Sequence, residues 1–435
     1  MRHCTHFARP LIFGTLLTLS TISAQAAPLS ANGMAFPTAQ ATDESPQGRK
    51  YRAGIQALLQ GNLPKAKAGF EAALKIDPRY APALIGLAGV AQAERKPAET
   101  EQYLQRAEHA APRSPAVYLA WGRYFIAGKQ FDRAERSLLK ARELDPKVMP
   151  PMLELGDLYL HSGRVAEARK IYGEAVALDA ANKFAQYGFG TAAAATGQRE
   201  EALRAFETAA KLAPKDPMPL RAAGLLYLEA GAVDKALDAF DKALARQPKF
   251  MPLMLDRADA LARQKRWNDA LAQVDQAEKL APNSAVVQLK MADIYQGAAR
   301  WDEAEARYLE AIRLEPRSAI AFNNLAWMTV TRHGDSKKAV EWARRAVELS
   351  PGSSPFHDTL GWALRAAGDL PGAQASLQQA ITLEPKVAAY HFQLGVVQGE
   401  LKLPAAARAS LQRALELDPQ LPQADEARRL LKSLN

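Results

Sequence analysis

The chain has 435 residues, of which 48% are hydrophobic and only 7% are aromatic. Alanine supplies much of the apolar fraction, and small apolar residues spread evenly suit close helix-to-helix packing better than the large aromatic core of a compact globule. The 56 basic and 47 acidic residues give a net charge of +9 but are interspersed, which leaves no block of like charge for a phosphate backbone and argues against nucleic acid as a partner.

Residues 1–26 have the pattern of a secretory signal peptide. Arg2 and Arg9 supply a positive start, residues 11–18 an apolar stretch, and residues 24–26, Ala-Gln-Ala, a small-residue cleavage site. Because the apolar stretch is too short to cross about 30 Å of hydrocarbon, a cleaved signal is favoured over a membrane anchor. The sequence therefore predicts export to the periplasm, with no transmembrane segment in the mature chain.

The single cysteine, Cys4, precedes the apolar stretch. The lipid-modified cysteine of a bacterial lipoprotein follows such a stretch, so a lipoprotein is not predicted. Once the signal is removed the chain has no cysteine, which excludes disulfides, thiolate metal sites and cysteine nucleophiles from the mature form. Residues 27–46, rich in Ala, Ser, Thr and Pro, are predicted to form a flexible leader.

Residues 47–421 contain a repeat with a period of 34 residues. Prolines mark the period, with Ala180 in place of the fourth and one inserted residue before the ninth: Pro78, Pro112, Pro146, Pro214, Pro248, Pro282, Pro316, Pro351, Pro385 and Pro419. An alanine stands five residues before every one of these positions: Ala73, Ala107, Ala141, Ala175, Ala209, Ala243, Ala277, Ala311, Ala346, Ala380 and Ala414. The count is eleven repeats.

Each period is interpreted as two helices and a turn. Small residues, such as Gly156 and Ala175, belong where helices cross, since a larger side chain there would push the axes apart. Gly163 and its equivalents suit the end of the first helix, where left-handed backbone geometry is needed. A larger residue such as Tyr172 fills the space within the pair, and a proline ends the second helix because it lacks an N–H donor.

This pattern, seen in Gly224, Tyr227, Ala236, Phe240 and Ala243 followed by Pro248, resembles the tetratricopeptide repeat. The resemblance implies an all-α fold: a right-handed superhelical solenoid of antiparallel helix pairs, with the first helix of each pair lining a concave groove. The departures are the missing proline of the fourth repeat and the extra residue of the ninth, at residues 331–336. After the eleven repeats, residues 422–435 read as an amphipathic helix that caps the stack.

No catalytic constellation is found in the sequence. The histidines of the mature chain are scattered without an i,i+4 pair or an HExxH motif, and the sequence has no GxGxxG, Walker loop or GxSxG motif. The sequence therefore predicts a protein that is not an enzyme, with no cofactor and no metal site.

Candidate binding residues come from positions five, six and nine of the first helices, which the family resemblance places in the groove. Two sets stand out. The acidic set consists of Glu154, Asp157, Asp256, Asp259 and Asp293. The tryptophan set consists of Asn323, Asn324, Trp327, Asp358, Thr359, Trp362 and Arg365.

Each set also has a structural interpretation. Trp327 and Trp362 occupy the same position in neighbouring repeats and offer broad amphipathic surfaces for a ligand, but large residues also pack between repeats. The acidic set is equally compatible with a solvated face. Trp267 and Trp301 stand just before the second helix, where other repeats have aliphatic or aromatic packing residues, and are interpreted as core residues.

Two functions follow as expectations. The first is a periplasmic scaffold that binds a protein or peptide of the cell envelope in its groove, in envelope assembly, secretion or exopolysaccharide export. The second is a glycan-binding module of a polysaccharide export system, in which the two tryptophans stack on sugar rings. Residues 322–327 and 358–362 resemble repeats found in tetratricopeptide proteins of exopolysaccharide and exosortase systems in Gram-negative bacteria.

Overall fold

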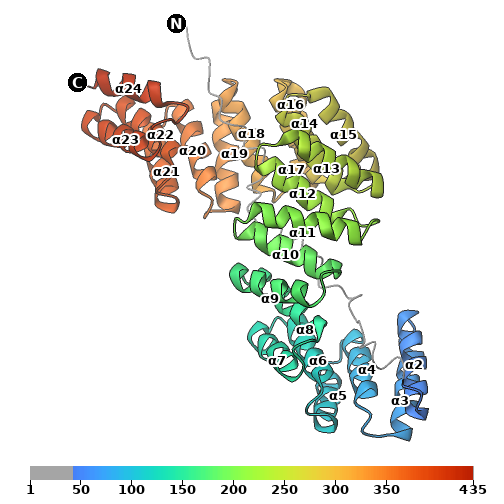
Figure 1. Cartoon of the computed structure of the whole chain (residues 1–435). Coiled ribbons are helices and arrows are strands. Elements are labelled where there is room, and N and C mark those ends of the chain that lie inside the picture. The colour runs from blue at the N-terminus through green and yellow to red at the C-terminus, as the bar shows by residue number, and fades with distance from the viewer. Residues whose placement is uncertain (1–42, 435) are drawn as a thin grey trace. The chain divides into compact units, whose positions relative to one another are not determined.

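The computed structural model describes residues 43–434, and every regular element within that range is a helix. The described part holds 23 helices, of which 22 form eleven consecutive pairs and the last stands alone (Figure 1). The signal peptide predicted over residues 1–26 and most of the predicted leader lie outside the described residues. Within residues 43–434, none of the helices combines the length and apolar character that crossing a bilayer requires. The described residues form two compact units, 43–226 and 227–434, with the boundary inside α12.

In the first unit, consecutive helices of 12 to 14 residues are joined by short turns and pack side by side. The first helix of each pair carries an even number and the second an odd number. The helices are α2 (Pro46–Leu59), α3 (Leu63–Ile76), α4 (Ala81–Ala93), α5 (Pro97–Ala110), α6 (Pro115–Ala127), α7 (Phe131–Leu144), α8 (Met149–His161), α9 (Val165–Leu178), α10 (Lys183–Ala195), α11 (Arg199–Leu212) and α12 (Met218–Glu229).

The second unit continues the same alternation. Its helices are α13 (Val233–Arg246), α14 (Met251–Arg263), α15 (Trp267–Leu280), α16 (Ala285–Gly297), α17 (Trp301–Leu314), α18 (Ala319–Thr331), α19 (Ser336–Leu349), α20 (Ser354–Ala366), α21 (Leu370–Leu383), α22 (Ala388–Glu400), α23 (Pro404–Leu417) and α24 (Ala424–Ser433). The predicted fold class, an all-α solenoid of eleven helix pairs with a final capping helix, is confirmed.

Small residues lie where the helices of a pair approach each other, as predicted. All eleven of the alanines that precede the proline positions are at most 1% exposed. A Cβ atom added to Gly156 would lie 2.4 Å from the Tyr172 ring, and one added to Gly395 would lie 2.7 Å from Leu411. Because real atoms do not approach this closely, these positions admit only glycine without a shift of the neighbouring helix.

The turn within each pair has the same backbone conformation in all eleven repeats. Gly61, Gly163, Gly197, Gly231 and Gly368 have positive φ, as the sequence predicts, and the other six repeats place a non-glycine residue in the same left-handed region: Arg95, Lys129, Lys265, Ala299, His333 and Lys402. The conformation is thus dictated by the packing of the pair, and glycine merely makes it less costly.

Replacing Ala299 by glycine should stabilise the protein. Its φ of 57° is unfavourable for an L-residue, and glycine would remove that strain at the cost of greater backbone freedom in the unfolded chain. The expected gain in the free energy of unfolding is about 0.5–1 kcal/mol, measured by urea unfolding followed by circular dichroism. Ala298→Gly, at the neighbouring C-cap position, should destabilise; a loss for Ala299→Gly would contradict this account of the turn.

The two irregular repeats keep the helix boundaries. α9 ends at Leu178 although Ala180 replaces the proline, and the Asp179 carboxylate accepts a hydrogen bond of 2.9 Å from the Ala181 N–H. In the ninth repeat the extra residue lengthens the turn between α18 and α19, and the Asp335 side chain caps α19 by accepting from the N–H groups of residues 337 and 338. Local side-chain caps therefore accommodate both departures.

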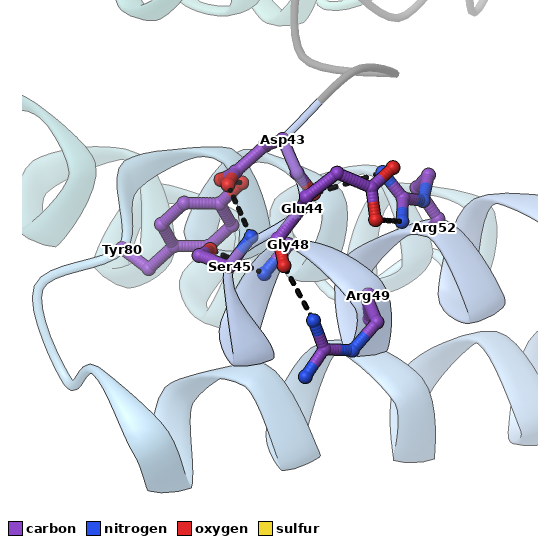
Figure 2. A network of polar contacts seen from close by, with 7 residues as sticks. All are labelled: Asp43, Glu44, Ser45, Gly48, Arg49, Arg52 and Tyr80. Carbon is purple, nitrogen blue, oxygen red and sulfur yellow. Dashed lines mark hydrogen bonds and ion pairs between the residues drawn. The ribbon is translucent and has the colours of Figure 1, made fainter.

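The start of the solenoid is fixed by a polar network (Figure 2). Ser45 caps α2, which begins one residue before the predicted start of the repeats. Asp43 accepts a hydrogen bond of 2.7 Å from the hydroxyl of Tyr80, and the Arg52 guanidinium donates to the Asp43 carbonyl at 2.8 Å. The last residues of the predicted leader are therefore attached to the first two repeats.

The other end is closed by α24. Leu421, Ala424 and Ala427 are buried against Phe392 and Leu411 of the last pair. The amphipathic pattern of residues 422–435 predicts this role, because a solenoid must cover its terminal apolar face.

Candidate functional site

Two carboxylates of the predicted acidic set, Glu154 and Asp157, lie on α8 in the unit of residues 43–226. Nε of Arg123 on α6 is 2.5 Å from Oε1 of Glu154, and the Tyr172 hydroxyl on α9 donates to Oδ1 of Asp157. Burial raises the pKa of both carboxyls, against the opposing effects of Arg123 and of the Tyr172 hydrogen bond. Both carboxylates are therefore bonded within the protein.

The other three carboxylates of the set lie in the unit of residues 227–434. Asp256 and Asp259 are on α14, and Asp293 is on α16. Nζ of Lys290 on α16 is 2.6 and 2.7 Å from the two carboxylate oxygens of Asp259, and both side chains are 11% exposed. Burial lowers the pKa of Lys290, but the charges of Asp259 and Asp293 outweigh it and the net shift is upward.

These ion pairs are related by the repeat. Arg123 and Glu154 stand 136 residues, four periods, before Asp259 and Lys290. The same two positions, one on the first helix of a repeat and one on the first helix of the next, thus form a largely buried ion pair in both units with the charges exchanged. Where both positions are charged in these two pairs, the charges are opposite, and either helix can carry the positive member.

Asp293 is the centre of a second polar network. Its Oδ1 accepts hydrogen bonds from the Tyr308 hydroxyl at 2.7 Å and from Nδ2 of Asn324 at 3.1 Å. Nδ2 of Asn323 in turn donates to Oδ1 of Asn324 at 3.3 Å. The structure therefore joins part of the acidic set and part of the tryptophan set into one cluster on α14, α16 and α18.

Sequence reasoning missed four residues of these networks: Arg123, Lys290, Tyr172 and Tyr308. Both tyrosines occupy the packing position within the pair, and their hydroxyls reach the aspartate of the same repeat. The available signal was the joint occurrence of Tyr at the packing position and Asp fifteen residues earlier, which is found in these two repeats. Lys290 stands at a predicted groove position, one period before Asn324.

The pH dependence of stability should report on Asp293. Burial raises the pKa of Asp293 from 3.8 to about 6, against the opposing effects of the Lys290 charge and the Tyr308 hydrogen bond. Between pH 3.8 and about pH 6, Asp293 is protonated in the folded state and ionised in the unfolded state. Folding therefore takes up a proton in this range, and the folded state becomes more stable as the pH falls. From about pH 7 to about pH 4, the free energy of unfolding of the wild type should rise relative to Asp293→Asn by about 1–3 kcal/mol in urea titrations. A difference independent of pH would contradict the assignment.

The tryptophan set is divided by its burial. Trp327 is partly exposed, whereas Asp358 and Thr359 are fully buried and Trp362 is 9% exposed. The Arg365 guanidinium lies over the Trp362 ring, 4.6 Å from its centroid, and forms an ion pair with Glu400. Of the two tryptophans in this set, Trp327 is thus the more exposed and the more accessible to a ligand.

The interpretation of Trp301 as a core residue is confirmed, because it packs against the cluster around Tyr308 and Leu325. Trp267 is partly buried, and its ring would lie 2.7 Å from a Cβ atom added to Gly297. Across residues 43–434, the side chains that commonly bind metals do not gather into a group of three or more.

Family models described as tetratricopeptide repeat match most of the chain. One matches residues 119–183, 187–250, 289–354 and 359–422, and a second matches residues 227–290. The chain is also similar to the crystal structure of yeast Tom70, with a TM-score of 0.53 and 13% identity, over 89% of this chain and 95% of that one. At this identity the likeness shows the fold alone.

Two curated proteins are similar over shorter segments. Cellulose synthase 1 operon protein C of Komagataeibacter xylinus is 25% identical over 231 residues, which is 50% of this chain and 17% of that protein. The human protein O-mannosyl-transferase TMTC1 is 32% identical over 133 residues, or 31% of this chain and 14% of that protein. The chain spans less than a fifth of the length of either. With the repeat pattern, the helix pairs and the family match in agreement, the chain belongs to the tetratricopeptide repeat family, whose members are scaffolds for protein interactions.

Proposed function

We propose that this protein is an exported adaptor that binds a partner protein on the first helices of its repeats, in the assembly or export of an envelope polysaccharide. The observation that carries the proposal is the similarity to cellulose synthase 1 operon protein C. This similarity extends over 231 residues and covers 50% of this chain. The signal-peptide pattern of residues 1–26 supports export of the protein. Export to the periplasm suits the proposed role, because an envelope polysaccharide crosses this compartment.

A protein partner suits the fold. Stacked helix pairs present a long row of side chains on which an extended segment or a helix of another protein can lie, with affinity set by a few residues. The first helices of repeats seven to nine carry a lysine, aspartates and asparagines that are joined in one cluster. This concentration of specific hydrogen-bonding groups supports binding on the first helices.

Site-specific photo-crosslinking in the native host tests the binding surface. A benzoyl-phenylalanine at Trp327, on the first helix α18, replaces one large aromatic by another. The control places the same probe at Leu309, which is 44% exposed on the second helix α17. We expect a discrete crosslinked product from position 327 and not from position 309. Crosslinks from position 309 alone would place the binding surface on the second helices and overturn the proposal.

Export is tested separately. The mature protein should fractionate with the periplasm, and its N-terminal sequence should begin just after residue 26. A chain that stays in the cytoplasm with residues 1–26 intact would remove the basis for a role in the envelope.

A glycan-binding function is the second candidate, favoured by the partial exposure of Trp327 and the similarity to a cellulose synthase operon protein. An indole face stacks well on the apolar face of a sugar ring. Cosedimentation with purified cellulose should then retain the wild type and release Trp327→Ala. Retention of both proteins to the same extent would exclude Trp327 as a sugar-binding residue.

A further inference from the structure

A pocket lies between the turns within repeats two and three, in the unit of residues 43–226. One of these turns joins α4 to α5 and the other joins α6 to α7. The pocket has a volume of about 370 Å³, which is in the range of small-molecule sites. It contains no residue of the acidic set or of the tryptophan set, so it is a separate feature of the protein.

The pocket is open because residue 128 is glycine. Gln264 and Arg332 stand four and six periods after Gly128, and each reaches across to the second helix of the preceding repeat. Gln264 donates a hydrogen bond of 2.6 Å to Asp234, and Arg332 forms an ion pair of 3.4 Å with Asp302. Gly128 has no side chain that could make such a contact, so the space beside the start of α5 stays accessible.

The charges around the pocket leave one cation without a contact. Ala98 takes the position of the two aspartates just described, so α5 offers no carboxylate there. Lys96 lines the pocket but is paired with Glu94 at 2.8 Å and Glu99 at 3.8 Å. The exposed Arg95 guanidinium has neither an ion-pair nor a hydrogen-bond partner within residues 43–434. Arg95 therefore brings the pocket a positive charge that contacts no carboxylate.

The neutral groups of the pocket suit an anion with an apolar body. Oε1 of Gln130 accepts a hydrogen bond of 2.7 Å from Arg133, and Nε2 of Gln130 lies 3.3 Å from the place of a Cβ atom on Gly128. The amide N–H donors of Gln130 thus lie at the pocket wall. The Tyr124 ring supplies apolar surface, and its hydroxyl is already bonded to Glu101 at 2.9 Å.

We propose that this pocket binds a small organic acid, with the carboxylate on the Arg95 guanidinium and the apolar part against the Tyr124 ring. The planar fork of an arginine matches a carboxylate through two parallel N–H···O bonds. A carboxylate carries one negative charge, whereas a phosphate dianion would leave excess negative charge beside Glu94 and Glu99. The site is independent of the proposed function, because a partner bound through the acidic or tryptophan sets does not use it.

Isothermal titration calorimetry of the full chain with benzoate tests the proposal. The matched probes are benzamide, a neutral molecule of the same shape, and phenylphosphonate, which is a dianion above neutral pH. We expect benzoate to bind at least about tenfold more tightly than either, and added salt to weaken its binding. Equal binding of benzoate and benzamide, or no binding of benzoate, would overturn the proposal. Tighter binding of phenylphosphonate would overturn the assignment to a carboxylate.

A second probe separates a free acid from an acidic side chain of another protein, which presents the same carboxylate. This probe is a blocked pentapeptide with one glutamate among four glycines. We expect it to bind more weakly than benzoate, because it offers no apolar body to the Tyr124 ring. Tighter binding of the peptide would assign the pocket to a protein ligand and overturn the proposal of a small molecule.

Arg95→Gly separates a ligand role from a structural one. Arg95 has a φ of 59°, and glycine occupies the equivalent position in five repeats, so the variant should be at least as stable as the wild type. It should bind benzoate at least about tenfold more weakly. Lys265→Gly removes the same charge five periods later, also from a φ of 59°, and should change benzoate binding by less than about twofold. Equal effects of the two variants would contradict a site at Arg95.

Gly128→Gln fills the pocket without changing the charge of the protein. It installs the residue found at the equivalent position 264, and the φ of −81° at Gly128 is open to any residue. The variant should keep the circular dichroism spectrum and the unfolding midpoint of the wild type and bind benzoate at least about tenfold more weakly. Unchanged benzoate binding in this variant would show that the ligand lies elsewhere and would overturn the proposal.

Discussion

Asp259→Ala should lower the free energy of unfolding by about 3 kcal/mol, the largest loss expected from one charge in this protein. The substitution leaves the Lys290 ammonium largely buried without the carboxylate that it contacts at 2.6 and 2.7 Å. Lys290→Ala should cost a similar amount, because it leaves Asp259 and Asp293 beside each other in the same region. Urea unfolding followed by circular dichroism measures both.

The exchanged pair of the other unit supplies the control. The double variant Asp259→Arg with Lys290→Glu reproduces Arg123 and Glu154 at the equivalent positions, where Asp157 is also present beside the acidic member. Its stability should return to within about 1 kcal/mol of the wild type. If the double variant is as unstable as the single ones, then position-specific packing decides stability and the exchange of charges between the units has no structural meaning.

Gly188→Ala should also destabilise strongly, by about 2–3 kcal/mol. A Cβ atom at this position would lie 2.3 Å from the Tyr172 ring, which is buried and also faces Gly156 on its other side. The ring has little freedom to yield, since its hydroxyl is bonded to Asp157. The helices of neighbouring repeats would therefore have to separate.

Gly173→Ala is the matched control on α9. Its Cβ atom would meet the Phe189 ring at 3.5 Å, an ordinary contact, so the change should stabilise the helix by about 0.5–1 kcal/mol. Equal losses for Gly173→Ala and Gly188→Ala would show that the effect comes from helix propensity and would refute the close approach at Tyr172.

The fold could be predicted from the sequence almost in full because the repeat multiplies each weak signal. Ala73 and its ten equivalents identify the helix crossing, and every one of them is buried. Even the turn at Ala299, which lacks the expected glycine, adopts the predicted backbone. Local propensity, the small-residue pattern and the helix ends agree at each position, and such agreement specifies a single structure.

The candidate site could be predicted only in outline. The positions were identified from family geometry, but Asp358 and Thr359 are fully buried, and Asp259 is satisfied by Lys290 from the next repeat. Burial and pairing at such positions depend on how far each first helix is covered by its neighbours. That quantity is set by packing between repeats and is not encoded in the residue type at one position.

Hydrogen exchange of the full chain, with and without the partner identified by crosslinking, tests most directly the central claim that the first helices form the binding surface. The account predicts slower amide exchange on binding in α14, α16, α18 and α20, with the second helices between them little changed. Protection confined to α15, α17 and α19 would contradict it.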